Sequence, residues 1–431
     1  MLHERATGFF RKGDKHANLT SCSSRGTWGI RRLTVKNTTS KTEPPKELGM
    51  KNVANLGIVS MFTDISTEMI LGVLPIFVVT QLGATKELLG LMEGAADFLN
   101  YMFRVFSGAI SDRVGRRKPL VFLGYGLSTF AKPLFALVTS WSGAFVVRLV
   151  DRAGKGVRTS PRDALISESV KEVKSGTAFG LHRSADQVGA VVGPVLAFLL
   201  VPLFGFKGIF WISLIPGTLS LIVLIFFVQD RIRPKNSTPV FKNVGSVLTR
   251  RFKIFLLVMG IFALGAYNFA FVLVEASTLG VSSDTIALVY ATLNVATIMV
   301  GFPSGLLSDR FGKDRVLVVG FGLFFVASLA GVMATEGVFL AFGIAFIYGA
   351  YIGISETLQR AFVPSFVSAE LKGTAYSVYY LVIGICSLVA NVLFGVLSDH
   401  FSMSAAFTYS LVTSSAGILG MLVFIVLKPK I

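Results

Sequence analysis

The stretch Gly108-Ala-Ile-Ser-Asp112-Arg-Val-Gly115-Arg-Arg-Lys118 occurs a second time in this chain, as Gly305-Leu-Leu-Ser-Asp309-Arg-Phe-Gly312-Lys-Asp-Arg315. The displacement between these copies also aligns Gly176-Thr-Ala-Phe179 with Gly373-Thr-Ala-Tyr376 and Gln81-Leu-Gly83 with Thr278-Leu-Gly280. Three separated matches at one displacement indicate an internal duplication. The sequence therefore predicts two homologous halves in parallel orientation.

The sequence around these stretches is apolar over long blocks. Hydrophobic residues make up 53% of the 431 residues and charged residues 15%, which is too little charge for the surface of a water-soluble domain. Blocks such as 254–276 and 316–333 are long enough to cross a bilayer as helices, where the backbone satisfies its own hydrogen bonds. The composition predicts an all-α polytopic membrane protein and excludes soluble enzymes and secreted domains.

Hydropathy predicts twelve transmembrane helices, centred near residues 67, 97, 129, 154, 190 and 218 in the first half and 265, 295, 325, 349, 385 and 417 in the second. We expect the six-helix halves over residues 51–228 and 251–431, a basic cytosolic linker over 229–250, and a disordered basic tail over 1–50. Translation from Met50 is an alternative explanation for the tail's different composition.

We attribute the net charge of +17 to the orientation of the protein in the membrane and not to nucleic-acid binding. Lysine and arginine cluster in the tail, in the linker and in the loops that follow residues 112 and 309. The positive-inside rule then places both termini in the cytosol. We expect a multi-pass protein of the cell membrane.

At this point the chain, from about residue 52 to 428, resembles the major facilitator superfamily. The stretch that begins at Gly108 matches the family's loop motif at nearly every position, with Ile110 and Ser111 as conservative departures. The resemblance implies a gating role for both copies, with Asp112 facing the positive N-terminal end of a helix from the other half. The alternative is a plain positive-inside loop. The motif residues are Gly108, Asp112, Arg113, Gly115, Arg116, Arg117, Gly305, Asp309, Arg310 and Gly312.

A second motif lies in the fifth predicted span. Gly180, Gly189, Gly193 and Pro194 resemble the family's antiporter motif, although its final two glycines are replaced here by alanine and phenylalanine. Small residues let helices pack closely and proline bends them, so generic packing is an alternative explanation. The motif favours export.

Charged residues inside the predicted spans are concentrated in the first half. Placing a charged side chain at bilayer depth costs at least about 2.5–3.5 kcal/mol of insertion free energy. We therefore treat each such residue as a candidate functional residue. Those of the fourth span step at helical intervals and predict one polar face that lines a cavity, with a helix break at Ser160-Pro161. The expected substrate and cavity residues are Glu93, Asp97, Arg148, Asp151, Arg152 and Lys155. The expected gate or ion network comprises Arg158, Arg162, Asp163, His182, Arg183, Asp186, Glu356 and Arg360.

Proton coupling needs a carboxylate that is partly buried and not fully salt-bridged, so that its pKa approaches physiological pH. Asp64 and Glu68 on the first span are the candidates, with Glu275 opposite them on the seventh. The alternative is that Asp64 and Glu68 are merely counter-ions for Arg148 and Arg152.

No nucleotide-binding loop, catalytic triad or metal-ligand spacing occurs in the sequence, so we expect no enzyme activity and no cofactor beyond a proton gradient. The leading hypothesis is a monomeric, proton-coupled exporter of a small organic molecule that works by alternating access between its halves. An uptake symporter of an anionic metabolite, which the basic fourth span would suit, is an alternative. A non-transporting membrane sensor on the same fold is another. The expected partners are the substrate and the lipid bilayer, and not nucleic acid.

Overall fold

The computed structural model describes residues 48–171, 174–231, 244–368 and 371–427, with Ser175 and Arg360 described in their backbone only. The expected tail therefore lies outside the described residues except for residues 48–50. The expected linker is described only at its two ends, 229–231 and 244–250. The described part is helical, and it contains no β-strand.

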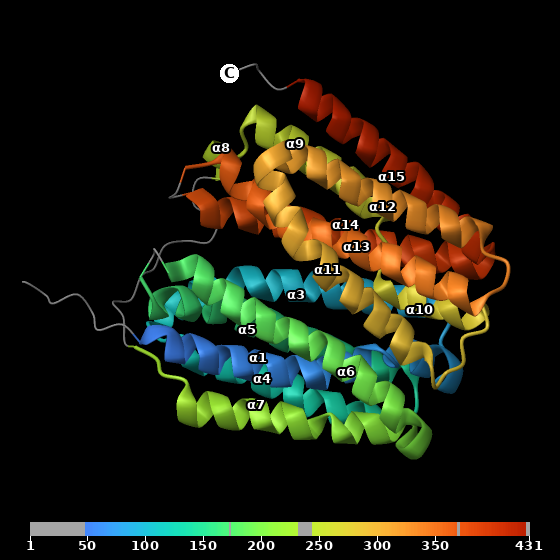
Figure 1. Cartoon of the computed structure of the whole chain (residues 1–431), viewed down its shortest axis with the longest axis horizontal. Coiled ribbons are helices and arrows are strands. Elements are labelled where there is room, and N and C mark those ends of the chain that lie inside the picture. The colour runs from blue at the N-terminus through green and yellow to red at the C-terminus, as the bar shows by residue number, and fades with distance from the viewer. Residues whose placement is uncertain (1–47, 172–173, 232–243, 369–370, 428–431) are drawn as a thin grey trace, which may run out of the picture. The chain divides into compact units, whose positions relative to one another are not determined.

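In the described residues twelve spans form two groups of six, which confirms the predicted fold (Figure 1). The first group comprises α1 (Gly49–Leu71) continued by α2 (Leu74–Ile76) and η1 (Phe77–Gln81), α3 (Lys86–Val114), α4 (Lys118–Ala131) continued by η2 (Lys132–Ala136), α5 (Trp141–Ser169), α6 (Ser175–Ile212) and α7 (Leu214–Phe227). After the short α8 (Val244–Val247), the second group comprises α9 (Arg250–Gly265) with α10 (Phe269–Thr278), α11 (Ile286–Phe311), α12 (Lys313–Met333), α13 (Val338–Phe362) continued by η4 (Val363–Phe366), α14 (Lys372–His400) and α15 (Met403–Val426).

The fifth and sixth spans run into one another. Gly205 interrupts α6 with a φ of +64°, a value that glycine adopts without strain, and the sixth span starts there. By length and hydropathy, eight helical stretches of the described residues could cross a membrane, one of them being this double stretch 176–227. The helices α3 and α5 are absent from that set although they are long. They carry charged residues along their length, and several of these line the cavity described below.

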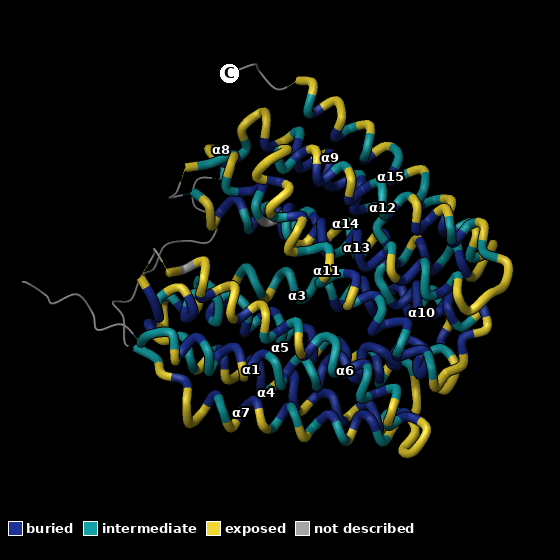
Figure 2. Tube along the Cα trace, viewed as in Figure 1, coloured by how far each residue is buried: buried dark blue, intermediate teal, exposed yellow. Residues whose placement is uncertain are grey.

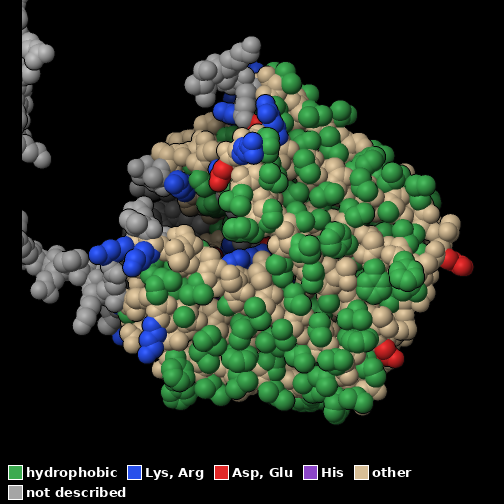
Figure 3. All heavy atoms as spheres, viewed as in Figure 1, with side chains coloured by type: hydrophobic (Ala, Val, Ile, Leu, Met, Phe, Trp, Pro, Cys, Tyr) green, Lys and Arg blue, Asp and Glu red, His purple; other side chains and the backbone are tan. Residues whose placement is uncertain are grey.

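The lateral surface of the helix bundle is apolar. Large hydrophobic side chains such as Phe226, Phe302 and Val412 are exposed on the outer helices, and hydrophobic side chains cover most of the face seen in Figure 3. Buried residues lie on the inner sides of the same helices (Figure 2). A surface of this kind suits hydrocarbon and not water.

The two halves pack closely against each other at one end of the helices. We call the end that holds the turns at Gly115 and Gly312 the basic end, and the other the opposite end. At the opposite end α3 and α14 touch so closely that a Cβ on Gly90 would lie 2.1 Å from the carbonyl oxygen of Asn391, and one on Gly395 would lie 2.5 Å from that of Lys86. At the basic end a Cβ on Gly180 would have nothing within 4 Å. The interface between the halves is therefore closed at the opposite end and open at the basic end, where Figure 3 shows a hollow.

The predicted break at Ser160-Pro161 is wrong, because α5 continues to Ser169 with Pro161 inside it. Neighbouring groups of α3 hold the helix in the turn that precedes the proline. The Ser160 hydroxyl donates to the carbonyl oxygen of Arg104 (2.7 Å), and the Ser107 hydroxyl donates to that of Gly156 (3.2 Å). A proline inside a transmembrane helix is tolerated where such groups supply hydrogen bonds.

Candidate functional site

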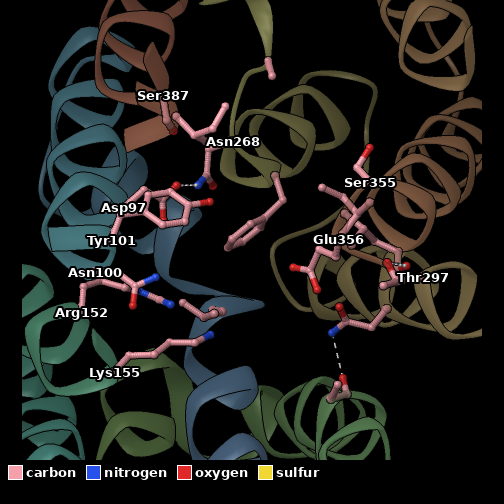
Figure 4. Close-up of a pocket in the computed structure, with 18 of the residues that line it drawn as sticks. Asp97, Asn100, Tyr101, Arg152, Lys155, Asn268, Thr297, Ser355, Glu356 and Ser387 are labelled. Carbon is pink, nitrogen blue, oxygen red and sulfur yellow. Dashed lines mark hydrogen bonds between the residues drawn. The ribbon is translucent and has the colours of Figure 1, made fainter. Parts of the chain in front are cut away.

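A cavity of about 420 Å³ lies between the two halves and is lined by residues of α1, α3, α5 and α6 from the first half and of α9, α10, α11, α13 and α14 from the second. The lining is polar on the side of the first half and largely aromatic, amide and hydroxyl on the side of the second. Figure 4 shows the side chains of Arg152 and Lys155 facing Ser355 and Glu356 across the space.

A buried ion-pair cluster lies behind the first-half wall of this cavity. The Arg148 guanidinium donates to both carboxylate oxygens of Glu93, from Nε (2.9 Å) and from Nη2 (2.5 Å), and both side chains are 1% exposed. Asp151 lies 3.5 Å from Arg148 and 3.6 Å from Arg152, and accepts a hydrogen bond from Ser128 (2.6 Å). Glu93 and Asp151 do not line the cavity, and Arg148 reaches it with its charge already paired. The charges of these three predicted substrate residues therefore compensate one another.

The next three cations along α5 face the cavity with fewer partners. Arg152 contacts a carboxylate only through the 3.6 Å approach of its Nε to Asp151, and its buried Nε and Nη2 have no hydrogen-bond acceptor in the described part. Arg158 stacks on the ring of Tyr125 at 4.6 Å, and its buried Nη1 likewise has no acceptor there. The Lys155 ammonium forms neither an ion pair nor a hydrogen bond with a described residue, although the main-chain carbonyl of Lys155 accepts from the Thr159 hydroxyl (2.6 Å). A strip of incompletely compensated positive charge thus lines the cavity.

The two carboxylates of α1 also line the cavity, and they differ from each other. Glu68 accepts a hydrogen bond from the Tyr290 hydroxyl of α11 across the interface (2.6 Å). Asp64 forms no ion pair and no hydrogen bond to a described residue, and its charged neighbours are Asp186, Lys155, Glu68 and Arg158. Neither carboxylate forms an ion pair with Arg148 or Arg152, whose partners are those given above, so the counter-ion alternative does not describe this conformation.

A second hydrogen bond joins the halves through Asp97, whose carboxylate accepts from the Asn268 side-chain amide (3.0 Å; Figure 4). Asn268 also caps α10, accepting from the Ala270 N–H (3.0 Å), while its own N–H donates to the Asn391 side chain (2.8 Å). The seventh span is thus interrupted at the cavity, between α9 and α10. Broken helices of this kind surround the binding sites of many transporters.

The expected gate residues form separate small groups toward the basic end. Asp163 pairs with Arg162 (2.8 Å) and, more distantly, with Arg104 (3.9 Å), and His182 approaches Asp186 (3.6 Å). The pair Arg183–Glu356 (3.2 Å) joins the halves, and both side chains are about half exposed. The side chain of Arg360 lies outside the described residues.

In the loop motif, Arg117 is the centre of the contacts. It pairs with Asp112 (2.5 Å) and Glu168 (3.2 Å) and also bonds the Ser111 hydroxyl, all within the first half. The resemblance implied that Asp112 contacts a helix of the other half. In the described part it does not, because the halves are apart at this end. Gly115 (φ +73°) and its counterpart Gly312 (φ +93°) form the turns, and Arg113, Arg116, Asp309 and Arg310 are exposed.

The sequence is similar to those of known proteins. The model of the Major Facilitator Superfamily matches residues 56–273 and 254–431. The chain belongs to the Major Facilitator Superfamily. An uncharacterized transporter of this superfamily from Methanocaldococcus jannaschii is 33% identical over 378 residues, which cover 85% of this chain and 93% of that protein.

Two further similar proteins share less sequence with the chain. The multidrug resistance protein MdtG of Proteus mirabilis is 27% identical over 275 residues, covering 61% of this chain and 68% of that protein. Among solved structures, a bacterial homologue of the human lysosomal transporter Spinster, in an inward-facing and occupied conformation, superposes with a TM-score of 0.70 at 17% identity, covering 87% of this chain and 95% of that one. At this identity the likeness shows the fold alone. The chain is therefore a membrane transporter of the superfamily and not an enzyme.

The motif that resembles the superfamily's antiporter motif determines how α6 packs on α1. A Cβ on Gly189 would lie 2.6 Å from the carbonyl oxygen of Met61 and 2.9 Å from the Cβ of Asp64. One on Gly193 would lie 2.8 Å from the carbonyl oxygen of Ile65 and 2.9 Å from the Cβ of Glu68. The two glycines thus oppose the two carboxylates of α1, one helical turn apart. In contrast, Gly180 has open space around it.

Replacing Gly189 with alanine is expected to destabilise the protein by about 1–3 kcal/mol, because the added methyl group meets backbone and must push α1 away from α6. A lower midpoint of thermal unfolding in detergent would show this. The matched control is Gly180→Ala, which belongs to the same motif and should leave the midpoint unchanged or slightly higher. Equal effects of the two substitutions would contradict this account of the motif.

The structure also places two charged residues where the sequence analysis did not. Glu275, expected opposite α1, does not line the cavity. It is buried in α10 and accepts a hydrogen bond from the Thr278 hydroxyl (3.1 Å). Lys132 was missed. Its ammonium is buried and donates to Ser66 (2.9 Å) and Thr67 (3.0 Å), with no ion pair to a described residue. A lone charge inside the third predicted span was the signal that could have found it.

Proposed function

We propose that this transporter exports a small organic molecule by alternating access and couples that movement to protons. The observation that carries the proposal is Asp64, which faces the cavity and has no ion pair or hydrogen bond to a described residue. A carboxylate with water access and no fixed partner can take up and release a proton as the cavity opens to either side. No cofactor beyond the proton gradient is needed.

The closed opposite end and the open basic end correspond to one of the two states that alternating access requires. The basic residues of the loop motif favour a cytosolic position for this end, by the positive-inside rule. Under that orientation the conformation faces the cytosol, both termini are cytosolic, and the membrane is the cell membrane. We expect a monomer, because the cavity is built within one chain.

The proposed direction of transport is supported by a similar protein and not by Asp64. The likeness to MdtG, whose name refers to multidrug resistance, supports export. The second candidate is uptake of an organic anion together with protons. The incompletely compensated cations Arg152, Lys155 and Arg158 favour it, because a proton on Asp64 would increase the positive charge that an anion meets.

The test compares the direction of proton movement with that of substrate movement. Vesicles that contain the transporter and an internal pH dye receive organic anions, cations and neutral molecules on the outside, with no preset gradient. If the transporter is an exporter that works by proton exchange, an entering substrate makes the interior more alkaline. If it co-transports protons, the interior becomes more acidic.

Vesicles from cells without the transporter provide the control. Absence of a response to every molecule of the panel would contradict coupled transport and favour the sensor alternative. A substrate that enters without any change of internal pH would contradict proton coupling alone.

A further inference from the structure

The buried guanidinium groups of the cavity wall lack acceptors. Arg152 is 5% exposed and Arg158 is 3% exposed, and three of their nitrogen atoms have no hydrogen-bond acceptor among the described residues. A buried donor without a partner costs about 1–3 kcal/mol, and more when it is charged. Lys155, one turn from each of them on α5, adds a third cation to the same surface. These donors point to an anion.

Three carboxylates of the cavity wall accept a hydrogen bond or form an ion pair. Glu68 receives the Tyr290 hydroxyl and Asp97 receives the Asn268 amide. Glu356 on the far wall is paired with Arg183. Asp64 has no such partner among the described residues and lies beside Lys155 and Arg158, while Asp186 has only the 3.6 Å approach of His182, and its buried Oδ1 receives no hydrogen bond there. Among the described residues of the lining, three cations thus have donors without an acceptor, against two carboxylates, Asp64 and Asp186, that receive no hydrogen bond.

The wall that faces the cations is aromatic. Phe269 and Tyr290 both line the cavity, and their rings pack at 4.8 Å between centroids. Tyr267 and Tyr348, also in the lining, form a second stacked pair at 5.3 Å. Rings in this position can pack against a flat apolar group of a ligand. The volume of about 420 Å³ falls in the range of sites for small organic ligands.

We infer that the cavity binds an amphipathic organic anion, whose carboxylate, sulfonate or phosphate group contacts Arg152, Lys155 and Arg158 and whose apolar ring packs against Tyr290 and Phe269. The inference rests on the proposed function only in that the cavity is the transport site. It names the substrate class and does not assume a direction of transport. Arg158, predicted as a gate residue, becomes a substrate residue, while Arg148 is excluded because Glu93 already neutralises it.

The test is isothermal titration calorimetry on the full chain in detergent with three probes of one shape: naphthalene-2-sulfonate, naphthalene-2-methanol and 2-naphthylmethylammonium. The sulfonate should bind at least about tenfold more tightly than the other two, and its binding should weaken with added salt. Lys155→Gln should weaken sulfonate binding about tenfold or more, the size of one lost charge-assisted hydrogen bond. Arg152→Gln should act likewise. Lys155→Gln keeps the test decisive if Arg152→Gln fails to fold, because Lys155 has no ion pair to lose.

Lys207→Gln is the matched control, since Lys207 is exposed and does not line the cavity. It should bind the sulfonate with unchanged affinity. Equal or tighter binding of the ammonium probe, or an unchanged affinity in Lys155→Gln, would overturn the inference. Sulfonate binding without any coupled proton movement would leave the anion site standing and contradict the proposed function. Coupled proton movement with cationic substrates alone would do the reverse.

Discussion

Asparagine in place of Asp64 is expected to abolish proton movement coupled to the substrate while substrate still crosses the membrane down its own gradient. The amide has the shape of the carboxylate but cannot bind or release a proton in this range, so the cavity loses a carboxylate that has no ion pair and no hydrogen bond to a described residue. Substrate-driven pH changes in vesicles should fall to the level of vesicles without the transporter. Exchange of labelled for unlabelled substrate, which needs no net proton transfer, should persist.

Three further carboxylates make this expectation specific. Asp284→Asn removes a carboxylate from an exposed turn and should leave coupling unchanged. Glu68→Gln and Glu275→Gln change the other two candidates, of which Glu68 bonds Tyr290 in the cavity and Glu275 lies outside it. If Asp64→Asn retains full coupling and either glutamine variant loses it, the assignment of Asp64 is wrong and that glutamate replaces it.

The largest loss of stability is expected from Glu93→Gln. This change leaves the fully buried Arg148 guanidinium with only the 3.5 Å contact to Asp151 as ionic compensation. Removing one partner of a buried ion pair typically costs about 3–5 kcal/mol. The variant should unfold at a clearly lower temperature in detergent, or fail to accumulate in the membrane.

A double variant shows whether the loss of stability comes from the unpaired charge of Arg148 or from a requirement for the ion pair itself. Glu93→Leu combined with Arg148→Met removes both charges and should recover most of the lost stability, because apolar replacements of a buried pair are often neutral or stabilising. Arg183→Gln is the control on an exposed pair and should change the unfolding free energy by less than about 1 kcal/mol. A double variant as unstable as Glu93→Gln alone would show that the cost comes from lost shape and not from the unpaired charge.

The sequence was sufficient for the fold. The repeat of the stretch at Gly108 and the length of the apolar blocks predicted twelve helices in two halves, because helix length is determined by bilayer thickness and needs no knowledge of packing. Helical periodicity also predicted that α5 turns a charged face toward the cavity. Five of its charged residues, Arg148, Arg152, Lys155, Arg158 and Arg162, do line it.

The choice of ionic partners could not be predicted in this way. Periodicity places Arg148 on a face of α5 but does not say whether α1 or α3 packs there, and the structure shows that α3 supplies Glu93. The position of Glu275 depends on the interruption between α9 and α10, after which Phe269 still lines the cavity whereas Glu275, further along α10, does not. Both outcomes depend on contacts between distant segments, and hydropathy contains no information about these.

The charges of α3 and α5 bear on how the first half enters the bilayer during synthesis. Neither helix is among the stretches apolar enough to cross a membrane by length and hydropathy, whereas α1 and the helices of the second half are. Glu93 and Arg148 compensate each other only when both are inside, so α3 is expected to remain shallow or outside until α5 has been translated. Biogenesis of this half is then cooperative over three consecutive helices. Cysteine labelling of chains truncated before α5 reports this delay, and the double variant that lacks both charges should shorten it.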